Sequence, residues 1–308
     1  MDFLRRWPEQ TTRTPLPTAA SSTDLNLPAP ESLARGDFDI VIRRLADDLA
    51  FGSDTSRLLG SGLEYASSRP YIPGDSVRLL NWRLTARTGR AYVREYEALK
   101  RTSVYIFIDT SASMAVRSVA RSKHDLAIWI ASALGLVAQR RMSPVALVGA
   151  GERTVALVAS LSRNDLWQSL EPLRAHDFTE GTELAARIRQ IAARATRASL
   201  FVVLSDLHDP DAVSAIRHAA QKHDVAVMHL LDPSETKPVR AGFFRGREAE
   251  TGRSFLGTSR TQFGNPDETR AELLRSGADY LRLETDQAFL APLRHYLGAR
   301  GLLARGRG

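Results

Sequence analysis

The sequence predicts an α/β fold, a doubly wound, mostly parallel six-stranded sheet with one antiparallel edge strand. From Ser103 onward, short apolar runs rich in β-branched residues alternate with helical patterns, which implies a parallel sheet covered on both faces. The runs at 145–148 and 155–158 are joined only by residues 149–154. That connection is too short for a crossover helix, so the second run is expected to pair antiparallel at one edge.

Each element follows from its own pattern. Strands are expected at 104–108, 145–148, 155–158, 200–204, 225–231 and 280–283, and helices at 123–140, 165–173, 183–195, 211–223, 266–276 and 287–297. Ahead of the sheet, apolar residues from Phe38 to Leu49 fall at helical spacing. A helix is therefore expected from Asp37 to Phe51, ending before Gly52.

Composition divides the 308 residues into four parts. Residues 1–35 are rich in Pro, Ser, Thr and Ala and hold little that could form a core, so a flexible tail is predicted there. Residues 36–102 are expected to form an N-terminal helix and an Arg/Gly-rich segment. The sheet domain is predicted at 103–300, and 301–308 form a basic tail.

Several classes of protein are excluded by composition. The chain has no cysteine, which excludes a disulfide scaffold, a cysteine-ligated metal site and thiol catalysis. Its N-terminus lacks the apolar core of a secretory signal, and its longest apolar run, 126–138, falls short of the roughly 20 residues that a membrane span needs. A cytoplasmic protein is predicted.

The candidate site lies where the first sheet strand ends, at Asp109-Thr110-Ser111-Ala112-Ser113. Ligands bind at the carboxyl ends of strands in open α/β sheets, and carboxylates and hydroxyls are hard oxygen ligands that suit Mg²⁺ or Mn²⁺. Thr182 opens the helix 183–195, and Asp206 follows the strand 200–204. Asp109, Ser111, Ser113, Thr182 and Asp206 therefore predict a divalent-cation site. The alternative is that the two serines and Thr182 only cap helices.

Two motifs carry a family resemblance. Asp109-x-Ser111-x-Ser113 with Thr182 and Asp206 downstream resembles the metal-ion-dependent adhesion site of von Willebrand factor A domains. The segment before it resembles the bacterial domain of unknown function 58 family. The residues that carry this second likeness are Gly62-Leu63-Glu64, Arg69-Pro70-Tyr71-Ile72-Pro73-Gly74-Asp75, Arg78, Asn81-Trp82, Ala86-Arg87 and Val93-Arg94-Glu95.

The resemblance implies a von Willebrand A-like fold and a non-enzymatic, metal-dependent binding module. It also implies that the protein acts with a MoxR-type AAA+ ATPase as an adaptor or co-chaperone. A carboxylate of a protein partner would complete the coordination of the cation. The chain departs from the family in two ways: Glu180-Gly181-Thr182 stands where the family has Gly-Gly-Thr, and the N-terminal membrane helices of many relatives are not expected here.

The Arg-rich segment at 60–101 carries most of the excess of basic over acidic residues. One interpretation is structural: Arg69, Arg78 and Arg87 pair with Glu64, Asp75 and Glu95, and Trp82 anchors a core, because a buried indole usually finds a partner for its N–H. The other is a docking face for an acidic partner, formed by Arg69, Arg78, Trp82 and Arg87, because the arginine fork binds carboxylates with two bonds.

Two other functions compete with that of a binding module. A Mg²⁺-dependent phosphatase needs a second acid two residues after Asp109, where Ser111 stands, and Ser205, Asp206 and His208 are too close in sequence for a hydrolase relay. Nucleic-acid binding would explain the net charge of +7, but Asp75, Glu95 and Glu97 interrupt the arginines. The expectation is a protein that is not an enzyme and binds no nucleic acid.

Overall fold

The computed structural model describes residues 24–50, 63–98, 102–151, 158–175, 178, 181–236, 243–247, 254–258 and 266–299. The helices are α1 (Arg35–Ala50), α2 (Trp82–Thr88), α3 (Lys123–Arg140), α4 (Arg163–Arg174), α5 (Leu184–Arg194), α6 (Ala212–Ala219), α7 (Pro233–Thr236), α8 (Pro266–Arg275) and α9 (Leu290–Ala299). The strands are β1 (Leu63–Pro70), β2 (Tyr92–Ala98), β3 (Val104–Ile108), β4 (Val145–Gly149), β5 (Leu200–Ser205), β6 (Asp224–Leu231), β7 (Phe243–Arg247), β8 (Ser254–Thr258) and β9 (Asp279–Glu284).

The centre of the molecule is a parallel sheet of five strands in the order β4-β3-β5-β6-β9. The chain leaves β3 for β4 on one side and later returns to β5 on the other side of β3. In doubly wound sheets, this reversal opens a crevice at the carboxyl ends of the two central strands. The carboxyl ends of β3 and β5 are therefore the expected place for a ligand.

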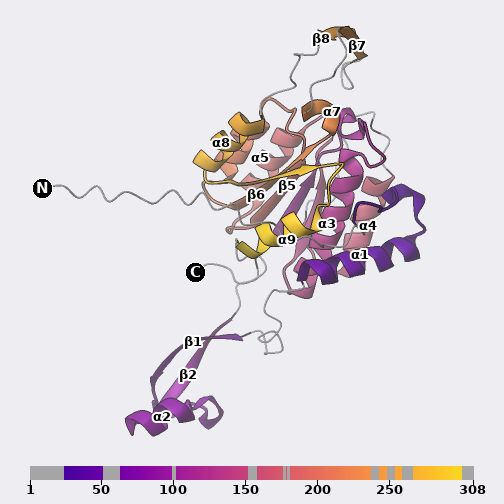
Figure 1. The fold of residues 1–308 in the computed structure, drawn as a ribbon. Coiled ribbons are helices and arrows are strands. Elements are labelled where there is room, and N and C mark those ends of the chain that lie inside the picture. Colours follow the sequence, from indigo (N-terminus) through magenta and orange to yellow (C-terminus); the bar gives the residue numbers. More distant parts are fainter. Residues whose placement is uncertain are drawn as a thin grey trace, which may run out of the picture.

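Helices cover both faces of this sheet (Figure 1). Alternate strand residues such as Ile106 and Leu204 pack with α1, α3, α4 and α9 in one cluster of buried apolar side chains. The intervening residues, Phe107 and Val203 among them, pack with α5, α6 and α8 in a second cluster. This alternation is the pleat of a strand buried on both sides, and it confirms the prediction of a parallel sheet between two helical layers.

The predicted sixth strand is not confirmed, and the sheet of described residues has five strands, all parallel. Residues 152–157 lie outside the described residues, and Val158 stands in a bend with 81% of its surface exposed. An isolated antiparallel bridge joins Val145 to Ser160 through two backbone hydrogen bonds of 2.9 Å each. The antiparallel edge strand at 155–158 therefore stays a prediction.

Residues 24–50 pack against the sheet domain, which differs from the predicted division of the chain. The buried carboxylate of Asp24 accepts hydrogen bonds from the backbone N–H groups of Phe289 and Leu290, at the start of α9. The indole of Trp129 in α3 donates to the carbonyl of Pro28, and its ring lies 4.8 Å from that of Phe38 in α1. Residues 24–35, predicted as tail, are thus fixed in place, whereas 1–23 and 301–308 lie outside the described residues.

Residues 63–98 of the Arg-rich segment form an antiparallel pair, β1 and β2, and α2 lies in the connection at the far end of this pair (Figure 1). Trp82, predicted as a core anchor, is 63% exposed, so that prediction is wrong. The reason is that residues 67–95 form a closed local structure in which Val93 is the one fully buried side chain. A second antiparallel pair joins β7 to β8. Among the helices of the described residues, none is both long and apolar enough to cross a bilayer.

Candidate metal centre

The topology brings the candidate residues to one edge of the sheet. Asp109 directly follows β3, and its backbone N–H donates to the carbonyl of Leu204 in β5, at 2.9 Å. Asp206 comes two residues after Leu204, at the end of the same strand. On the other side of β3, Ala150 donates to the carbonyl of Ile108 and accepts from the N–H of Glu183, both at 2.8 Å. This pair of bonds links Glu183, the residue after Thr182, to the end of β3 through Ala150.

Asp109 is a buried carboxylate whose two oxygens accept bonds inside the protein. Oδ1 accepts the backbone N–H of Ser111 at 3.0 Å, and Oδ2 accepts the hydroxyl of Ser205 at 2.6 Å. Burial first, and then the nearby charge of Asp206, raise the pKa of Asp109 to about 6. The two carboxylates are therefore close enough to repel each other, which is the arrangement that a cation relieves.

Two of the three hydroxyls predicted as ligands, those of Ser111 and Ser113, lie together near Asp206. The Oγ atoms of Ser111 and Ser113 are 3.0 Å apart, and a hydrogen bond from Ser113 lowers the pKa of Asp206. Ser111 precedes a short 3₁₀ helix without capping it through its side chain, and the N-cap of α5 is Glu183 rather than Thr182. The capping alternative is therefore not observed at Ser111 or Thr182. Thr182 Oγ1 is instead buried and has no hydrogen-bond partner among the described residues.

A lysine that the sequence analysis did not single out stands in this site. Lys123 is fully buried at the first turn of α3, and its Nζ donates to Asp206 Oδ2 at 2.7 Å and to Glu235 Oε1. Burial lowers the pKa of its ammonium group, but the charges of Asp206 and Glu235 outweigh this and raise it overall. A cation at a helix N-terminus opposes the helix dipole. Lys123 is therefore held there by the two carboxylates, and it is charged.

Asp206 therefore interacts with two neighbouring side chains, Lys123 and His208. Burial raises its pKa, but the charges of Lys123 and His208 overcome this and leave the pKa below its usual range. The Nδ1 atom of His208 lies 3.3 Å from Asp206 Oδ2. Asp206, His208 and Glu235 present ligand atoms within 4.8 Å of one another and form a second set that could hold a metal. A metal on that set would compete with the ammonium of Lys123, which already contacts two of its members.

The backbone around Asp206 is held in an unusual conformation. Leu207 has a φ of 58°, in the left-handed region that non-glycine residues seldom adopt, and its N–H donates to Ser205 Oγ at 2.8 Å. His229 in β6 lies 3.1 Å from the carbonyl of Asp206 through Nε2 and 2.8 Å from the hydroxyl of Tyr280 through Nδ1. Strain of this kind is maintained only where the surroundings impose it, and it clusters at functional sites.

Ser205, Asp206 and His208 do not form the hydrogen-bonded relay of a hydrolase. Ser205 Oγ donates to Asp109, and His208 Nδ1 faces Asp206. Ser205 and His208 thus serve different carboxylates rather than each other.

The Arg-rich candidates separate into two kinds. The guanidinium of Arg69 binds both oxygens of Asp75, at 2.7 and 2.8 Å, and also binds Glu95 at 3.0 Å. Of Arg69, Arg78 and Arg87, which were expected to brace the segment, Arg69 forms ion pairs with described residues. Arg78 and Arg87 are exposed and form no ion pair among the described residues. None of the Arg-rich candidates is part of the metal centre.

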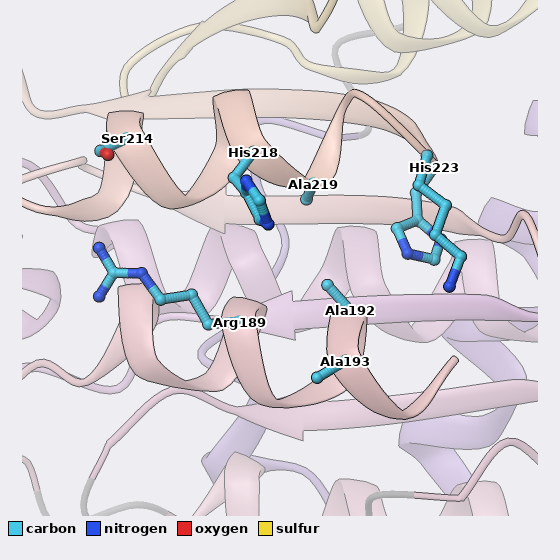
Figure 2. A pocket seen from close by; sticks show the side chains of 8 residues that line it. Arg189, Ala192, Ala193, Ser214, His218, Ala219 and His223 are labelled. Atoms are coloured by element: carbon cyan, nitrogen blue, oxygen red, sulfur yellow. The ribbon is translucent and has the colours of Figure 1, made fainter. Parts of the chain in front are cut away.

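A separate surface groove of about 500 Å³ lies between α5 and α6 (Figure 2). Its lining includes Arg189, Ala192, His218 and His223. The ring of His223 stacks on Phe201 with centroids 4.3 Å apart. Burial lowers the pKa of His223. No predicted site residue lines this groove, and it lies away from the carboxyl ends of the strands that hold Asp109 and Asp206.

Sequence reasoning missed Lys123 and Glu235. One signal for Lys123 was present: of the 42 Lys and Arg residues only four are lysines, and this one stands shortly before the longest apolar run of the chain, 126–138. Glu235 had no such signal, because its role depends on α7 following β6 at the same sheet edge.

Similarity to known proteins identifies the family of this chain. Residues 67–272 match the model of a family described as "Protein of unknown function DUF58". The chain belongs to the DUF58 family. Two uncharacterized relatives, one from Mycobacterium bovis and one from Mycobacterium tuberculosis, are each 26% identical to it over 297 residues. The alignments cover 88% of this DUF58 chain and 94% of each relative.

Two solved structures are similar to this DUF58 protein at low identity. One is the conserved hypothetical protein BatB from Bacteroides thetaiotaomicron, 18% identical with a TM-score of 0.46, covering 66% of this chain and 98% of that one. The other is the RO (RSR) protein of Deinococcus radiodurans, 19% identical with a TM-score of 0.35, covering 65% of this chain and 34% of that one. At these scores neither likeness supports a statement about function.

Proposed function

We propose that this DUF58 protein is a non-enzymatic binding module that takes up Mg²⁺ or Mn²⁺ at Asp109, Ser111, Ser113, Thr182 and Asp206. The observation that carries the proposal is an unbalanced charge: two buried carboxylates meet at the ends of β3 and β5, and one buried ammonium, that of Lys123, contacts only the second. Buried charge without a counterion is strongly unfavourable. A cation beside Asp109 would supply the missing positive charge.

The donor set fits such an ion. Two carboxylates and three hydroxyls are hard oxygen ligands, and the chain offers no thiolate that would favour a softer metal. The buried hydroxyl of Thr182 has no partner among the described residues, and a cation would give it one. The bound ion would act as an electrophile that attracts one further anionic oxygen.

We propose that a carboxylate of a protein partner supplies the last oxygen ligand of this site. Three neutral hydroxyls offset less of the ion's charge than carboxylates would, so the ion keeps its attraction for an acidic side chain. The resemblance to von Willebrand A domains and to proteins that work with MoxR-type AAA+ ATPases supplies the candidate partner, an ATPase of that class. The role would be that of an adaptor or co-chaperone in the cytoplasm.

Calorimetry with Mg²⁺ and with Mn²⁺ tests the cation. We expect binding by the wild type, loss of binding in Asp109→Ala and weaker binding in Thr182→Ala. Asp232→Asn is the matched control, because Asp232 is also a buried aspartate at the end of a sheet strand but is occupied by Ser118 and Ser234. Equal binding by wild type and Asp109→Ala would refute the site, and loss only in Glu235→Gln and His208→Ala would move the metal to the second set.

Binding to a purified MoxR-type ATPase from the same genome tests the partner. Capture that requires Mg²⁺ or Mn²⁺, and that EDTA and Asp109→Ala both abolish, is the expected result. Capture that ignores EDTA and Asp109→Ala would show that the metal is not the contact point.

A further inference from the structure

The Arg-rich segment presents an apolar surface that nothing in the described structure covers. Among its large apolar side chains, Ile72, Val77 and Trp82 are 58%, 60% and 63% exposed. Tyr71 and Leu79 are partly exposed as well, at 36% and 41%. All five belong to residues 71–82, which we call the hairpin loop. Five large apolar side chains left exposed in one short stretch of the chain make that stretch a candidate interaction site.

The hairpin loop is held in shape even though it has almost no core. At its two ends, Tyr71 N–H donates to the carbonyl of Ala91 at 2.9 Å and Asn81 N–H donates to the carbonyl of Tyr92 at 2.7 Å. Asn81 also caps α2 by accepting from Leu84 N–H at 3.2 Å. Hydrogen bonds and caps therefore fix the positions of Trp82 and its neighbours without burying them. A small two-stranded unit of this kind is only marginally stable when nothing packs on it.

Arg69 serves this local structure rather than a partner. It binds Asp75 with two bonds, and Asp75 Oδ2 in turn accepts the N–H of Ile72 at 2.9 Å. Together with the Glu95 contact, these bonds use both acidic side chains of residues 67–95. Of the four residues that the sequence offered as a docking face, Arg69 is thus structural.

Five further arginines of residues 67–95 lie in the hairpin loop or follow it in the chain. Arg78, Arg83, Arg87, Arg90 and Arg94 are all exposed, and none forms an ion pair among the described residues. Arginine and tryptophan together are the residue types most enriched in the energetic centres of protein interfaces. The surface is therefore both apolar and strongly basic, and every cation in it has the planar fork that binds carboxylates.

We infer that the hairpin loop and these arginines dock an acidic segment of another protein that carries apolar anchor residues. A nucleic acid would satisfy the arginines, but it would leave the aliphatic side chains of Ile72 and Val77 without a partner. A membrane surface requires apolar depth and charge but no fixed shape, whereas this loop is fixed by caps and ion pairs. A second copy of the chain is disfavoured because each copy carries a net charge of +7.

This surface is separate from the metal centre. β2 leads into the amino end of β3 through residues 99–103, whereas Asp109 lies at the carboxyl end of β3. The hairpin is thus attached at the opposite edge of the sheet from the cation site, and the inference does not depend on the cation. A protein with two recognition surfaces at opposite edges is able to hold two partners at once.

Selection of random displayed peptides on the full-length protein, in buffer with EDTA, tests the inference. We expect enriched peptides that combine acidic and apolar residues. Their affinity, measured by fluorescence anisotropy, should fall by about tenfold or more in Trp82→Ser and in Arg83→Glu. Ile40→Ser and Arg189→Glu are matched controls, because Ile40 is 60% exposed on α1 and Arg189 is an exposed arginine of α5, and neither should change binding.

Four outcomes would overturn the inference. One is the absence of any peptide whose binding depends on Trp82, and another is enrichment of peptides that lack acidic residues. A third is binding to phosphatidylserine vesicles or to a DNA duplex that the same variants abolish, which would reassign the surface to a lipid or a nucleic acid. The last is a dimer in sedimentation that Trp82→Ser dissolves, which would make the occupant a second copy. Thermal melting of each variant shows that the protein remains folded.

Discussion

The candidate metal centre and the hairpin loop each leave an interaction unmatched: buried charge in the first and exposed apolar surface in the second. At the metal centre, Asp109, Asp206 and Lys123 are fully buried among helices and strands, and their charges are only partly matched. At the hairpin loop, charges and apolar groups are both exposed, and one buried side chain, Val93, supports residues 67–95. Burial makes unmatched charge expensive in the first region, and exposure leaves unmatched apolar surface in the second. The first region therefore lacks a positive charge, and the second lacks an apolar partner.

Two tryptophans give the largest expected contrast between the regions. Trp129 is fully buried in α3 against Phe38, and Trp82 is 63% exposed. We expect Trp129→Ala to lower the free energy of unfolding by about 3–5 kcal/mol, the usual loss for emptying a buried aromatic site. Trp82→Ala should change it by less than about 0.5 kcal/mol. Chemical denaturation of both variants measures this, and a large loss in Trp82→Ala would mean that the hairpin loop is packed rather than open.

Two lysines test the unmatched charge of the metal centre. Lys123→Met leaves Asp206 and Glu235 without their ammonium, so we expect a loss of about 3–5 kcal/mol in EDTA. Lys222→Met removes a single hydrogen bond to the carbonyl of Ala195 and should lose about 1 kcal/mol. Saturating Mg²⁺ should narrow the stability difference between Lys123→Met and the wild type, and it should leave the difference between Lys222→Met and the wild type unchanged. Equal losses in the two variants would show that the buried ion pair does not stabilise the fold.

A pH series separates the regions by the groups that titrate. Burial lowers the pKa of His229 to about 4, so its contribution to stability is fully present above pH 6.5 and is lost as the pH falls through 4. Between pH 7.5 and 4.5 the wild type should lose about 2–3 kcal/mol more than His229→Gln, which cannot become charged.

The hairpin loop should not respond over the same interval. The pKa of Asp75 is lowered to about 2, chiefly by its hydrogen bonds to Arg69, so its contribution is present above about pH 4 and is lost only as the pH falls through 2. Denaturation in EDTA at each pH measures the first effect, and amide hydrogen exchange at residues 71–75 measures the second. Parallel pH profiles for wild type and His229→Gln would contradict the assignment of a neutral, buried His229.

The smallest expected effect is local to the hairpin loop. Arg69→Ala removes the ion pairs to Asp75 and Glu95, so the N–H of Ile72 loses its fixed acceptor and should exchange faster with solvent. Arg87→Ala, which breaks no ion pair, should leave that exchange rate unchanged. Neither variant should move the melting temperature of the sheet domain. Unchanged exchange in Arg69→Ala would mean that other contacts hold the loop.

Local sequence patterns predicted the α/β fold class, and they offered a set of candidate cation ligands, because the causes of both patterns are local. Apolar alternation gave the five sheet strands, and α3 begins and ends at the predicted residues because Ser122 caps it and its apolar run is unbroken. Asp109, Ser111, Ser113, Thr182 and Asp206 are candidate ligands because of their places at element ends, since parallel strands bring all their carboxyl ends to one edge. That they bind a cation stays a prediction.

Tertiary structure alone decided the rest, because those outcomes depend on which surfaces meet. The segment 24–35 has the composition of a tail, yet Asp24 is buried because the start of α9 offers it two N–H groups from far along the chain. Tryptophan is a residue type that often anchors a core, yet Trp82 is exposed because no element of the described residues packs over the hairpin loop. Lys123 and Glu235 enter the candidate metal centre only because α3 and α7 meet at Asp206, and Lys123 and Glu235 are more than a hundred positions apart in the sequence. Sequence determined which residues carry charge and where strands end, and packing determined which of them are buried together.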